Sequence, residues 1–210
     1  MPYVLQVGIH ASQERLEKLL AERLAPGANR EEIDARIWNL FGETWAVMFT
    51  DLSGFSRNVA EFGIIHFLQT IYESQRIFVP CVDQHDGILL KMEGDSMLVI
   101  FRTVANAIEC AIDMQRAAKA YNTDKPRTEQ ILQCVGLGYG PMLRIGDQDV
   151  FGPEVNAASK LGEDTAKAWE ILVTDSVLAA AGDLPGLRFE PIAEIPPGAK
   201  SAARVVYPQS

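Results

Sequence analysis

The sequence predicts an α+β sandwich, in which helices cover a sheet whose strands are partly joined by hairpins. Stretches with apolar residues at spacings of three and four alternate along the chain with short, nearly continuous apolar runs. The first pattern is typical of amphipathic helices and the second of buried strands. Several neighbouring runs are separated only by short segments containing Gly and Asp, which favour hairpin turns. Helices that alternate with hairpin-linked strands indicate a layered α+β fold.

Length and charge limit the size of the domain and the kinds of partner. The 210 residues are enough for one domain with a small appendage. The net charge of −9 argues against a nucleic-acid partner, because the phosphate backbone would be repelled. A small anionic substrate would therefore need local positive charge or metal ions to be held.

Cysteine usage and hydropathy predict a cytoplasmic protein. Cys81, Cys110 and Cys134 are odd in number, widely spaced and without a Cys-x-x-Cys pair, as expected of reduced, buried thiols. No apolar run approaches the roughly 20 residues of a membrane span, and the N-terminus lacks the apolar stretch of a signal peptide. The three histidines are scattered, so we expect no zinc site.

The first 42 residues predict a helical segment that precedes the main domain, residues 43–210. Tyr3–Ile9 is a short apolar opening, either a strand or an arm. A helix is expected from Ser12, and a second helix begins after the N-cap Asn29 and ends at Gly42. These two helices either cover a core or form a dimerising or signal-relaying segment.

The strand predicted over Trp45–Thr50 leads directly into an acidic, glycine-containing turn. Its continuous apolar run indicates a central strand that is buried on both faces. The run stops at Asp51-Leu52-Ser53-Gly54-Phe55-Ser56, where Ser and Gly after the acid leave backbone N–H groups free to face an anion. A long helix follows from Glu61 to Val82, and we expect Pro80 to kink or restart it.

A polar hairpin carries a second acidic turn. Two apolar runs, Ile88–Leu90 and Leu98–Phe101, flank the segment Lys91-Met92-Glu93-Gly94-Asp95-Ser96-Met97. Gly and Asp tolerate the positive φ angles of tight turns, so we expect Asp95 at the tip and Lys91 on the incoming strand. Taken alone, this stretch is also consistent with an ordinary hairpin that has a polar tip.

The second half of the chain continues the alternation of helices and strands. Pro153 suits the first turn of a helix, because its missing N–H is not needed there. The pattern predicts, in order, a helix over 103–121, a charged loop over 122–130, a strand over 131–140, a return strand over 142–150, a helix from Pro153 to about Ala166, a strand over 171–174, a short helix capped by Asp175, and a final hairpin pairing 187–189 with 204–207.

Asp51 and Asp95 form the first candidate site. One lies at a strand end and the other at a hairpin tip, and neighbouring strands are about 4.8 Å apart, so the two carboxylates can share a metal site. Paired carboxylates with free backbone carbonyls suit Mg²⁺ or Mn²⁺, which prefer oxygen ligands and often bind substrate phosphates. Two-metal phosphoryl transfer uses such a pair. The alternative is that both residues are turn-capping aspartates, which are common.

Two further clusters could bind parts of a nucleotide. Asn156 and Lys160 are spaced i, i+4 and therefore share one helix face, where an amide and a cation could hold a sugar or a phosphate. Lys91 and Asp149, a donor and an acceptor each beside a turn, could together bind the edge of a purine. Lys160 could instead pair in solvent with one of two following acids, Glu163 or Asp164.

In this order and at this spacing, the motifs resemble those of the class III nucleotide cyclase catalytic domain. Phe49–Ser56 is similar to the family's first metal-binding segment, Phe-x-Asp followed by an apolar residue, x, Gly-Phe-Ser/Thr. Lys91–Met97 resembles its Lys-x-x-Gly-Asp hairpin, and Val135–Pro141 resembles its Gly-containing strand. Asp149–Leu161 resembles its Asp-Val-x-Gly-x-x-Val-Asn-x-Ala-Ser-Arg helix entry. The match extends over about residues 45–177, and the ordered set is more specific than any single motif.

The resemblance implies a fold and a metal-binding half-site. The fold would be the family's ferredoxin-like, palm-type α/β sandwich, with an antiparallel-rich sheet covered by helices. Asp51 and Asp95, assisted by the Leu52 carbonyl, would bind two Mg²⁺ or Mn²⁺ ions. The triphosphate would be held by the backbone of five consecutive residues, Leu52, Ser53, Gly54, Phe55 and Ser56.

The resemblance also implies the substrate, the reaction and a homodimer. Lys91 and Asp149 would recognise adenine, and Asn156 would orient the ribose. The metal-binding residues of one chain would face the base- and ribose-binding residues of the other, which gives two composite sites per homodimer. The implied reaction converts ATP to 3′,5′-cyclic AMP and pyrophosphate by in-line attack of the ribose 3′-oxygen on the α-phosphorus.

Two departures from the family pattern leave other functions open. Lys160 stands where the family usually has an arginine that stabilises the transition state, and lysine loses the forked geometry, so we expect a slower enzyme or a different contact. Residues 142–147 form a shorter connection than usual, and Pro153-Glu154 replaces a single Asp after Gly152. Arg144 is a nearby cation that could compensate.

The alternatives are a cyclase for GTP or a pyrimidine triphosphate, and a degenerate domain that binds nucleotide without turnover.

Overall fold

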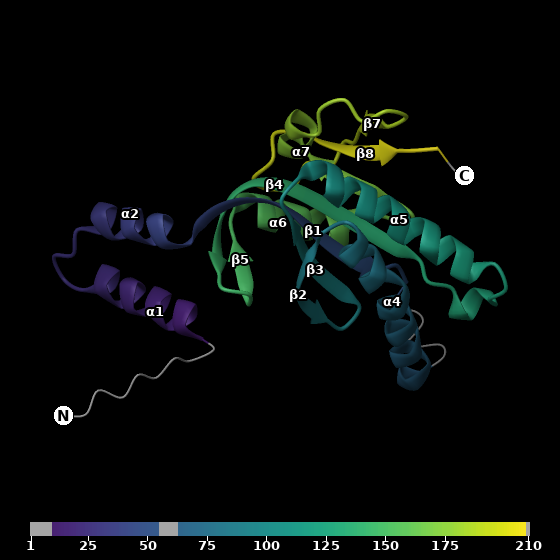
Figure 1. Ribbon diagram of the computed structural model, residues 1–210, viewed down its shortest axis with the longest axis horizontal. Coiled ribbons are helices and arrows are strands. Elements are labelled where there is room, and N and C mark those ends of the chain that lie inside the picture. Colours follow the sequence, from purple (N-terminus) through teal and green to yellow (C-terminus); the bar gives the residue numbers. More distant parts are fainter. Residues whose placement is uncertain (1–9, 55–62, 209–210) are drawn as a thin grey trace.

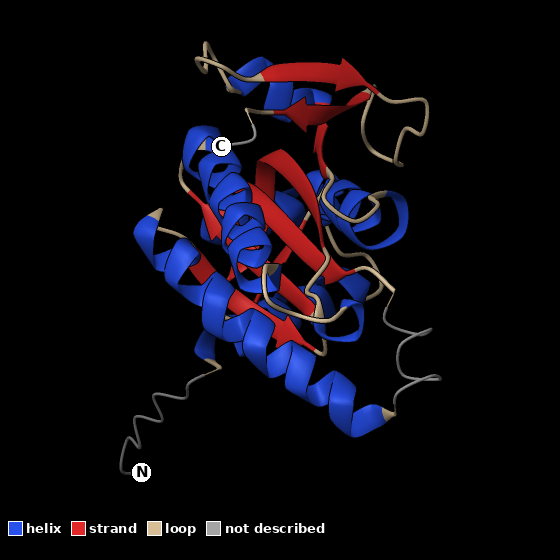
Figure 2. Ribbon diagram, turned by 90° about the vertical axis from the view of Figure 1, so that its right-hand side faces the viewer, coloured by secondary structure: helices blue, strands red, loops and turns tan. Residues whose placement is uncertain are grey.

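One mixed sheet organises the part of the chain that the computed structural model describes, residues 10–54 and 63–208. Helices pack on both faces of the sheet, and a helical hairpin extends from one end of it (Figure 1). Seen from the side in Figure 2, two long helices lie across the sheet. The predicted α+β sandwich is confirmed. The apolar opening Tyr3–Ile9 and the turn residues Phe55 and Ser56 lie outside the described residues.

The sheet is rich in antiparallel pairs. Its strand order is β2-β3-β1-β4-β6-β8-β7, with β5 paired to β4. Among the strand pairs of the described residues, only β4–β6 is parallel. The strands are β1 (Gly42–Leu52), β2 (Ile88–Glu93), β3 (Ser96–Phe101), β4 (Gln133–Ile145), β5 (Asp149–Phe151), β6 (Ile171–Thr174), β7 (Arg188–Pro191) and β8 (Ala202–Val206).

The central strand β1 is buried on both faces, as its continuous apolar run predicts. Successive side chains of a strand point to opposite faces, so Met48 and Val47 belong to different cores. Met48 packs in the larger core, beneath α4 (Ile64–Gln84) and α5 (Val104–Asn122). Val47 packs in the smaller core, beneath α6 (Pro153–Ser159). Because α6 is short, the second face of the sheet is only partly covered.

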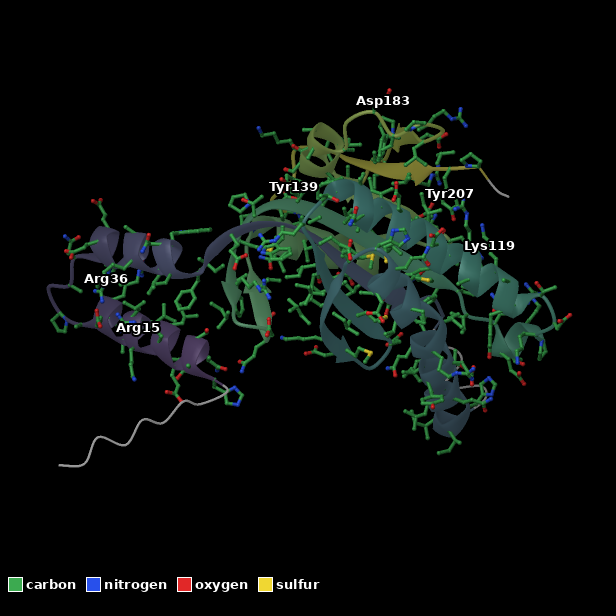
Figure 3. The ribbon with its side chains drawn as sticks, viewed as in Figure 1. Arg15, Arg36, Lys119, Tyr139, Asp183 and Tyr207 are labelled. Atoms are coloured by element: carbon green, nitrogen blue, oxygen red, sulfur yellow. The ribbon has the colours of Figure 1, made fainter. Side chains whose placement is uncertain are left out.

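The N-terminal helices form a hairpin that packs on the β4–β5 end of the sheet. These helices are α1 (Ala11–Leu24) and α2 (Arg30–Phe41), and the Asn29 side chain caps α2 as predicted by accepting from the Glu32 N–H. Arg36 lies between the two helices and donates to Glu22 at 2.8 Å (Figure 3). A small apolar cluster joins the hairpin to Ile145 of β4. The hairpin therefore covers a core of its own rather than the main one.

The predicted break in the strand at residue 141 is wrong. β4 continues through Pro141 to Ile145, and only Asp149–Phe151 forms the return strand β5. Pro141 lacks an N–H and removes one ladder bond. The strand continues because its long antiparallel register with β1 holds it on both sides of the proline, from Leu143 opposite Gly42 to Gln133 opposite Leu52.

Three smaller expectations also differ from the structure. α4 runs through Pro80 without restarting. The predicted helix after Pro153 ends as α6 at Ser159 and continues as a π-helical turn, η2 (Lys160–Thr165). Asp175 begins α7 (Asp175–Ala180) but does not cap it, because its carboxylate accepts from the Lys200 N–H at 2.8 Å.

The charged loop before β4 contains a single 3₁₀ turn, η1 (Arg127–Glu129). The final hairpin is confirmed as β7 and β8, with Phe189 opposite Val205. The three cysteines are free and buried, as predicted. Among the helices of the described ranges, none is both long and apolar enough to cross a membrane.

Candidate active site

The β1 terminus and the β2–β3 turn bring Asp51 and Asp95 together. Thr50 of β1 pairs with Met97 of β3, so the next residue of β1 lies beside the turn that carries Asp95. The Ser96 hydroxyl donates to Asp51 Oδ1 at 3.5 Å, which places this side chain beside the carboxylate. We refer to Asp51 and Asp95 as the carboxylate pair.

Burial and mutual repulsion make it unfavourable for both members of the carboxylate pair to be ionised. Burial, followed by the charge of Asp95 and a hydrogen bond with it, raises the pKa of Asp51 from 3.8 to about 7. One oxygen, Asp95 Oδ2, is buried and has no hydrogen-bond partner in the described part of the chain. A buried carboxylate oxygen without a partner is costly, and a divalent cation would satisfy it. The donor set therefore fits Mg²⁺ or Mn²⁺.

The acidic ligands of this site are few in the described part of the chain. In the described ranges, no group of three or more His, Cys, Asp or Glu side chains is arranged to hold a metal ion. A hard cation held by one or two carboxylates usually completes its coordination with water, backbone carbonyls and substrate phosphates. The pair is thus suited to metal ions that bind together with a phosphorylated substrate.

The turn after β1 only partly supports the predicted anion site. The Ser53 N–H donates to the Leu132 carbonyl at 2.7 Å, so this donor is not free to face an anion, and the expectation is wrong for this group. Gly54 has φ +89°, a left-handed conformation that glycine adopts without strain. The side chain of Leu52 is buried in the larger core. The other two residues of the proposed triphosphate segment lie outside the described ranges.

Lys91 and Asp149, 58 residues apart, meet in a direct ion pair between β2 and β5. A register irregularity of β2 precedes Lys91, between it and Leu89. Asp149 is held by a hydrogen bond from the Val150 N–H to its Oδ1 at 2.9 Å. We refer to Lys91 and Asp149 as the base-reading pair, after the role that the sequence resemblance predicts for them. Lys91 donates to Asp149 in this pair. The two residues can give up this contact for a ligand that offers an acceptor to Lys91 and a donor to Asp149.

A small pocket of about 130 Å³ opens beside the base-reading pair. It extends from the base-reading pair to Ser96, the residue that contacts Asp51. A pocket that encloses a whole small-molecule ligand usually measures about 300 Å³ or more. In the described part of a single chain, this pocket therefore does not enclose a nucleoside triphosphate. The lining residues are Phe49, Lys91, Glu93, Ser96, Met97, Leu98, Asp149 and Glu163.

Glycines of β4 bring α6, which carries Asn156 and leads directly into Lys160 of η2, against the sheet. A Cβ atom on Gly136 would lie 2.2 Å from the Ala158 carbonyl oxygen, and one on Gly138 would lie 2.4 Å from that of Glu154. Only glycine permits such close approach of a helix backbone to a strand. Asn156 and Lys160 point away from this contact and are exposed.

Lys160 pairs with an acid on its own helical turn. Its Nζ donates to Asp164 at 2.8 Å, and both side chains are exposed. The hydrogen bond with Asp164 raises the pKa of Lys160. In the single chain, Lys160 therefore forms the solvent-exposed pair with Asp164 that was the alternative to phosphate binding. Such a pair is weak, so a phosphate could displace it.

Glu154 is a structural residue of the site that the sequence patterns do not reveal. Its side chain is buried, and its carboxylate accepts hydrogen bonds from the Tyr139 N–H at 3.1 Å, the Thr174 hydroxyl at 2.7 Å and the Ser176 hydroxyl at 2.8 Å. These bonds tie α6 to β4, β6 and α7. Acidic residues in the first turn of a helix usually face solvent, so only the tertiary partners identify this one.

Arg144 is held by the β4–β5 turn and by Trp45. Its guanidinium donates to Asp147 at 2.7 Å and to the Gly146 carbonyl at 3.0 Å, and it lies 4.9 Å from the centre of the Trp45 ring. These contacts hold the β4–β5 turn against the start of β1. The structure gives no support to the expectation that Arg144 compensates for Lys160.

Comparison with known proteins decides the family. The sequence profile described as "Adenylate and Guanylate cyclase catalytic domain" matches residues 42–196, which is most of the chain. This chain belongs to that family. It is therefore a class III nucleotide cyclase domain, an enzyme class that generally uses divalent metal ions, and the resemblance of its ordered motifs is confirmed.

Individual relatives agree with this assignment. An adenylate cyclase of Mycobacterium tuberculosis is 30% identical over 189 residues, covering 80% of this chain and 41% of the relative. The crystal structure of an adenylate/guanylate cyclase/hydrolase from Silicibacter pomeroyi is 25% identical and superposes with a TM-score of 0.68, covering 80% of this chain and 98% of that one. The adenylyl cyclase CyaB from P. aeruginosa, 19% identical, shares the fold with a TM-score of 0.64 over 80% of this chain and 96% of that one.

The cyclase domain corresponds to only part of its curated relatives. It spans 41% of the mycobacterial protein and 22% of a matching protein from Rhizobium meliloti. The helices α1 and α2 precede the residues that the family profile matches.

Proposed function

We propose that this cyclase domain is an adenylate cyclase, which converts ATP to 3′,5′-cyclic AMP and pyrophosphate. The observation that carries the proposal is the carboxylate pair, whose Asp95 Oδ2 has no hydrogen-bond partner in the described residues, together with the direct pairing of Lys91 with Asp149. Residues 43–210 would form the catalytic domain and residues 1–42 an N-terminal helical segment. Relatives named adenylate cyclase support the choice of chemistry.

Each functional residue then has a defined task. Asp51 and Asp95, with the Leu52 carbonyl, would hold two Mg²⁺ or Mn²⁺ ions, which when bound activate the 3′-oxygen and neutralise the triphosphate. Asn156 would orient the ribose for in-line attack on the α-phosphorus. Lys160, once released from Asp164, would stabilise the negative charge that develops on the phosphate.

Adenine is the base that best matches the base-reading pair. Its N1 atom accepts a hydrogen bond and its neighbouring N6 amino group donates one. Lys91 Nζ can donate to N1, and the Asp149 carboxylate can accept from N6. When the ion pair breaks to make both contacts, Lys91 and Asp149 each keep a hydrogen-bond partner. This limits the desolvation penalty of binding.

A homodimer with two composite sites would complete the enzyme. The pocket of about 130 Å³ is too small for ATP, so a second surface must cover the substrate. The sheet face beside the pocket carries partly buried apolar side chains, Phe49, Ile88 and Leu90, and no helix other than the short α6 packs in that core. The carboxylate pair of one protomer would then face the base-reading pair of its partner.

The test is product formation by the full chain. The purified chain is incubated with Mn²⁺ and each of the four nucleoside triphosphates in turn, and the products are identified by mass spectrometry. Cyclic AMP as the main product supports the proposal. Cyclic GMP or a cyclic pyrimidine nucleotide as the main product keeps the reaction and overturns the base assignment.

A degenerate nucleotide-binding domain is the second candidate, and the Lys160–Asp164 pair favours it. In this alternative the lysine is already neutralised by its own turn and does not reach the phosphate. Binding of ATP without any cyclic product, at high protein and Mn²⁺ concentrations, would establish this alternative in place of the first.

A further inference from the structure

The N-terminal helix α1 forms one wall of a cavity whose other wall is the base-reading pair. This cavity measures about 320 Å³, a size that can hold a small ligand group. Gln13, Leu16 and Glu17 line it from α1. From the sheet it is lined by Lys91, Ile145, Gln148, Asp149 and Phe151. The base-reading pair therefore has hollow space on two sides, the small pocket towards the carboxylate pair and this larger cavity towards α1.

Several contacts hold α1 in this position. Leu19 is fully buried in the apolar cluster that includes Ile145, and Leu16 packs against the same cluster. Gln148, in the β4–β5 turn, contacts the ring of His10 at the start of the helix. At the other end of α1, Arg23 forms a two-pronged ion pair with Asp34 of α2. The wall is therefore a packed helix that belongs to the domain.

A hydrogen bond on this wall fixes which way the Gln13 amide faces. Gln13 and Glu17 are spaced i, i+4 and lie on one face of α1, where the Gln13 Nε2 donates to Glu17 Oε1 at 3.1 Å. Because the carboxylate accepts only, it turns the amide so that its NH₂ group faces Glu17. The Gln13 carbonyl oxygen is then the atom left to accept a hydrogen bond from a group in the cavity.

An acceptor opposite Asp149 discriminates between bases at one position. The exocyclic amino group of adenine has two N–H bonds, so it can donate to Asp149 and to the Gln13 carbonyl at once. Guanine has a carbonyl oxygen at that position, which would face two acceptors and receive a hydrogen bond from neither. Mismatched polar groups of this kind are rejected strongly.

We propose that Gln13, oriented by Glu17, is a specificity-determining residue of this cyclase domain, and that it selects a base with an exocyclic amino group over one with a carbonyl. The proposal rests on the proposed function of the same site. It extends base recognition to a helix that lies outside the residues matched by the family profile.

Equilibrium binding to the full chain tests the proposal without requiring turnover. The probes are 3′-deoxy-ATP and 3′-deoxy-GTP with Mg²⁺, which lack the attacking oxygen, and affinities are measured by calorimetry. Gln13→Lys places a donor where the carbonyl was, so the ratio of ATP- to GTP-analogue affinity should fall about tenfold. Glu17→Ala frees the amide to rotate and should lower the ratio about threefold. Glu14→Gln, on α1 but outside the cavity, is the matched control and should leave the ratio unchanged.

The outcomes separate this proposal from the one that it rests on. If the unmodified chain prefers the adenine analogue and Gln13→Lys leaves that preference unchanged, α1 plays no part in selectivity and only this inference is overturned. If Gln13→Lys changes both affinities by the same factor, α1 merely restricts access, which also overturns it. If the unmodified chain binds neither analogue, the proposed cyclase function itself fails.

Discussion

The carboxylate pair and the base-reading pair each take one member, Asp95 and Lys91, from the β2–β3 hairpin, but they are electrostatically opposite. In the first pair, two acids face each other and one buried oxygen has no partner in the described residues. In the second pair, a cation and an acid already satisfy each other. The carboxylate pair thus attracts a cation. The base-reading pair instead exchanges its mutual contact for contacts with a ligand. Affinity should depend mainly on the carboxylate pair and selectivity on the base-reading pair.

Removing one member of the carboxylate pair should have the largest effect. Asp51→Asn takes away the charge that would hold the metal ions, so cyclic AMP production should fall at least about 10³-fold. Steady-state assays with Mn²⁺ measure the loss, and Asp83→Asn, on the exposed surface of α4, serves as the control. Full activity in Asp51→Asn would remove the two-metal assignment.

Reversing the charge in the base-reading pair should change selectivity more than catalysis. Lys91→Glu places two acids side by side and removes the donor for adenine N1. The ratio of kcat/KM for ATP to that for GTP should fall by about 10- to 100-fold. Competition assays with both nucleotides measure this ratio. An unchanged preference for ATP would exclude Lys91 from base recognition.

Restoring the arginine of the family should have a moderate effect on the rate. Lys160→Arg supplies a forked guanidinium that can contact two phosphate oxygens, so we expect kcat to rise several-fold with little change in KM. The exposed pair with Asp164 offers little resistance to this exchange. A lower kcat in this variant would show that the site is adapted to lysine.

The smallest effect concerns the stability of the metal-free chain as pH changes. The pKa of Asp51 in the folded chain, about 7, lies above its ordinary value of 3.8. Between these values the folded chain binds more protons than the unfolded chain, so this group's contribution to the free energy of unfolding decreases as pH rises. In EDTA, the Tm of Asp51→Asn should therefore exceed that of the parent by a margin that grows from pH 5 to pH 8.

The corresponding metal experiment sharpens this comparison. Adding Mn²⁺ should raise the Tm of the parent chain more at pH 8 than at pH 5, because the ion binds the deprotonated carboxylate. Asp51→Asn should show little response at either pH. Scanning fluorimetry measures both, and equal responses of the parent at the two pH values would contradict the assignment.

The sequence by itself determined most of the elements of the fold. Apolar periodicity, the Asn29 cap and the Gly-Asp turns act over a few residues, so they predicted the helices, the central strand and the hairpin that carries Asp95. The spacing of Asn156 and Lys160 also predicted that both lie on one exposed helix face. These features depend on backbone geometry between near neighbours, which the local sequence controls.

Only the tertiary structure decided how these parts meet. The burial of Glu154 among Thr174 and Ser176 and the continuation of β4 through Pro141 both depend on contacts with distant parts of the chain. The same holds for α1, whose place beside the base-reading pair follows from packing on Ile145. Contacts of this kind come from three-dimensional complementarity between surfaces, and no local pattern in the sequence encodes them.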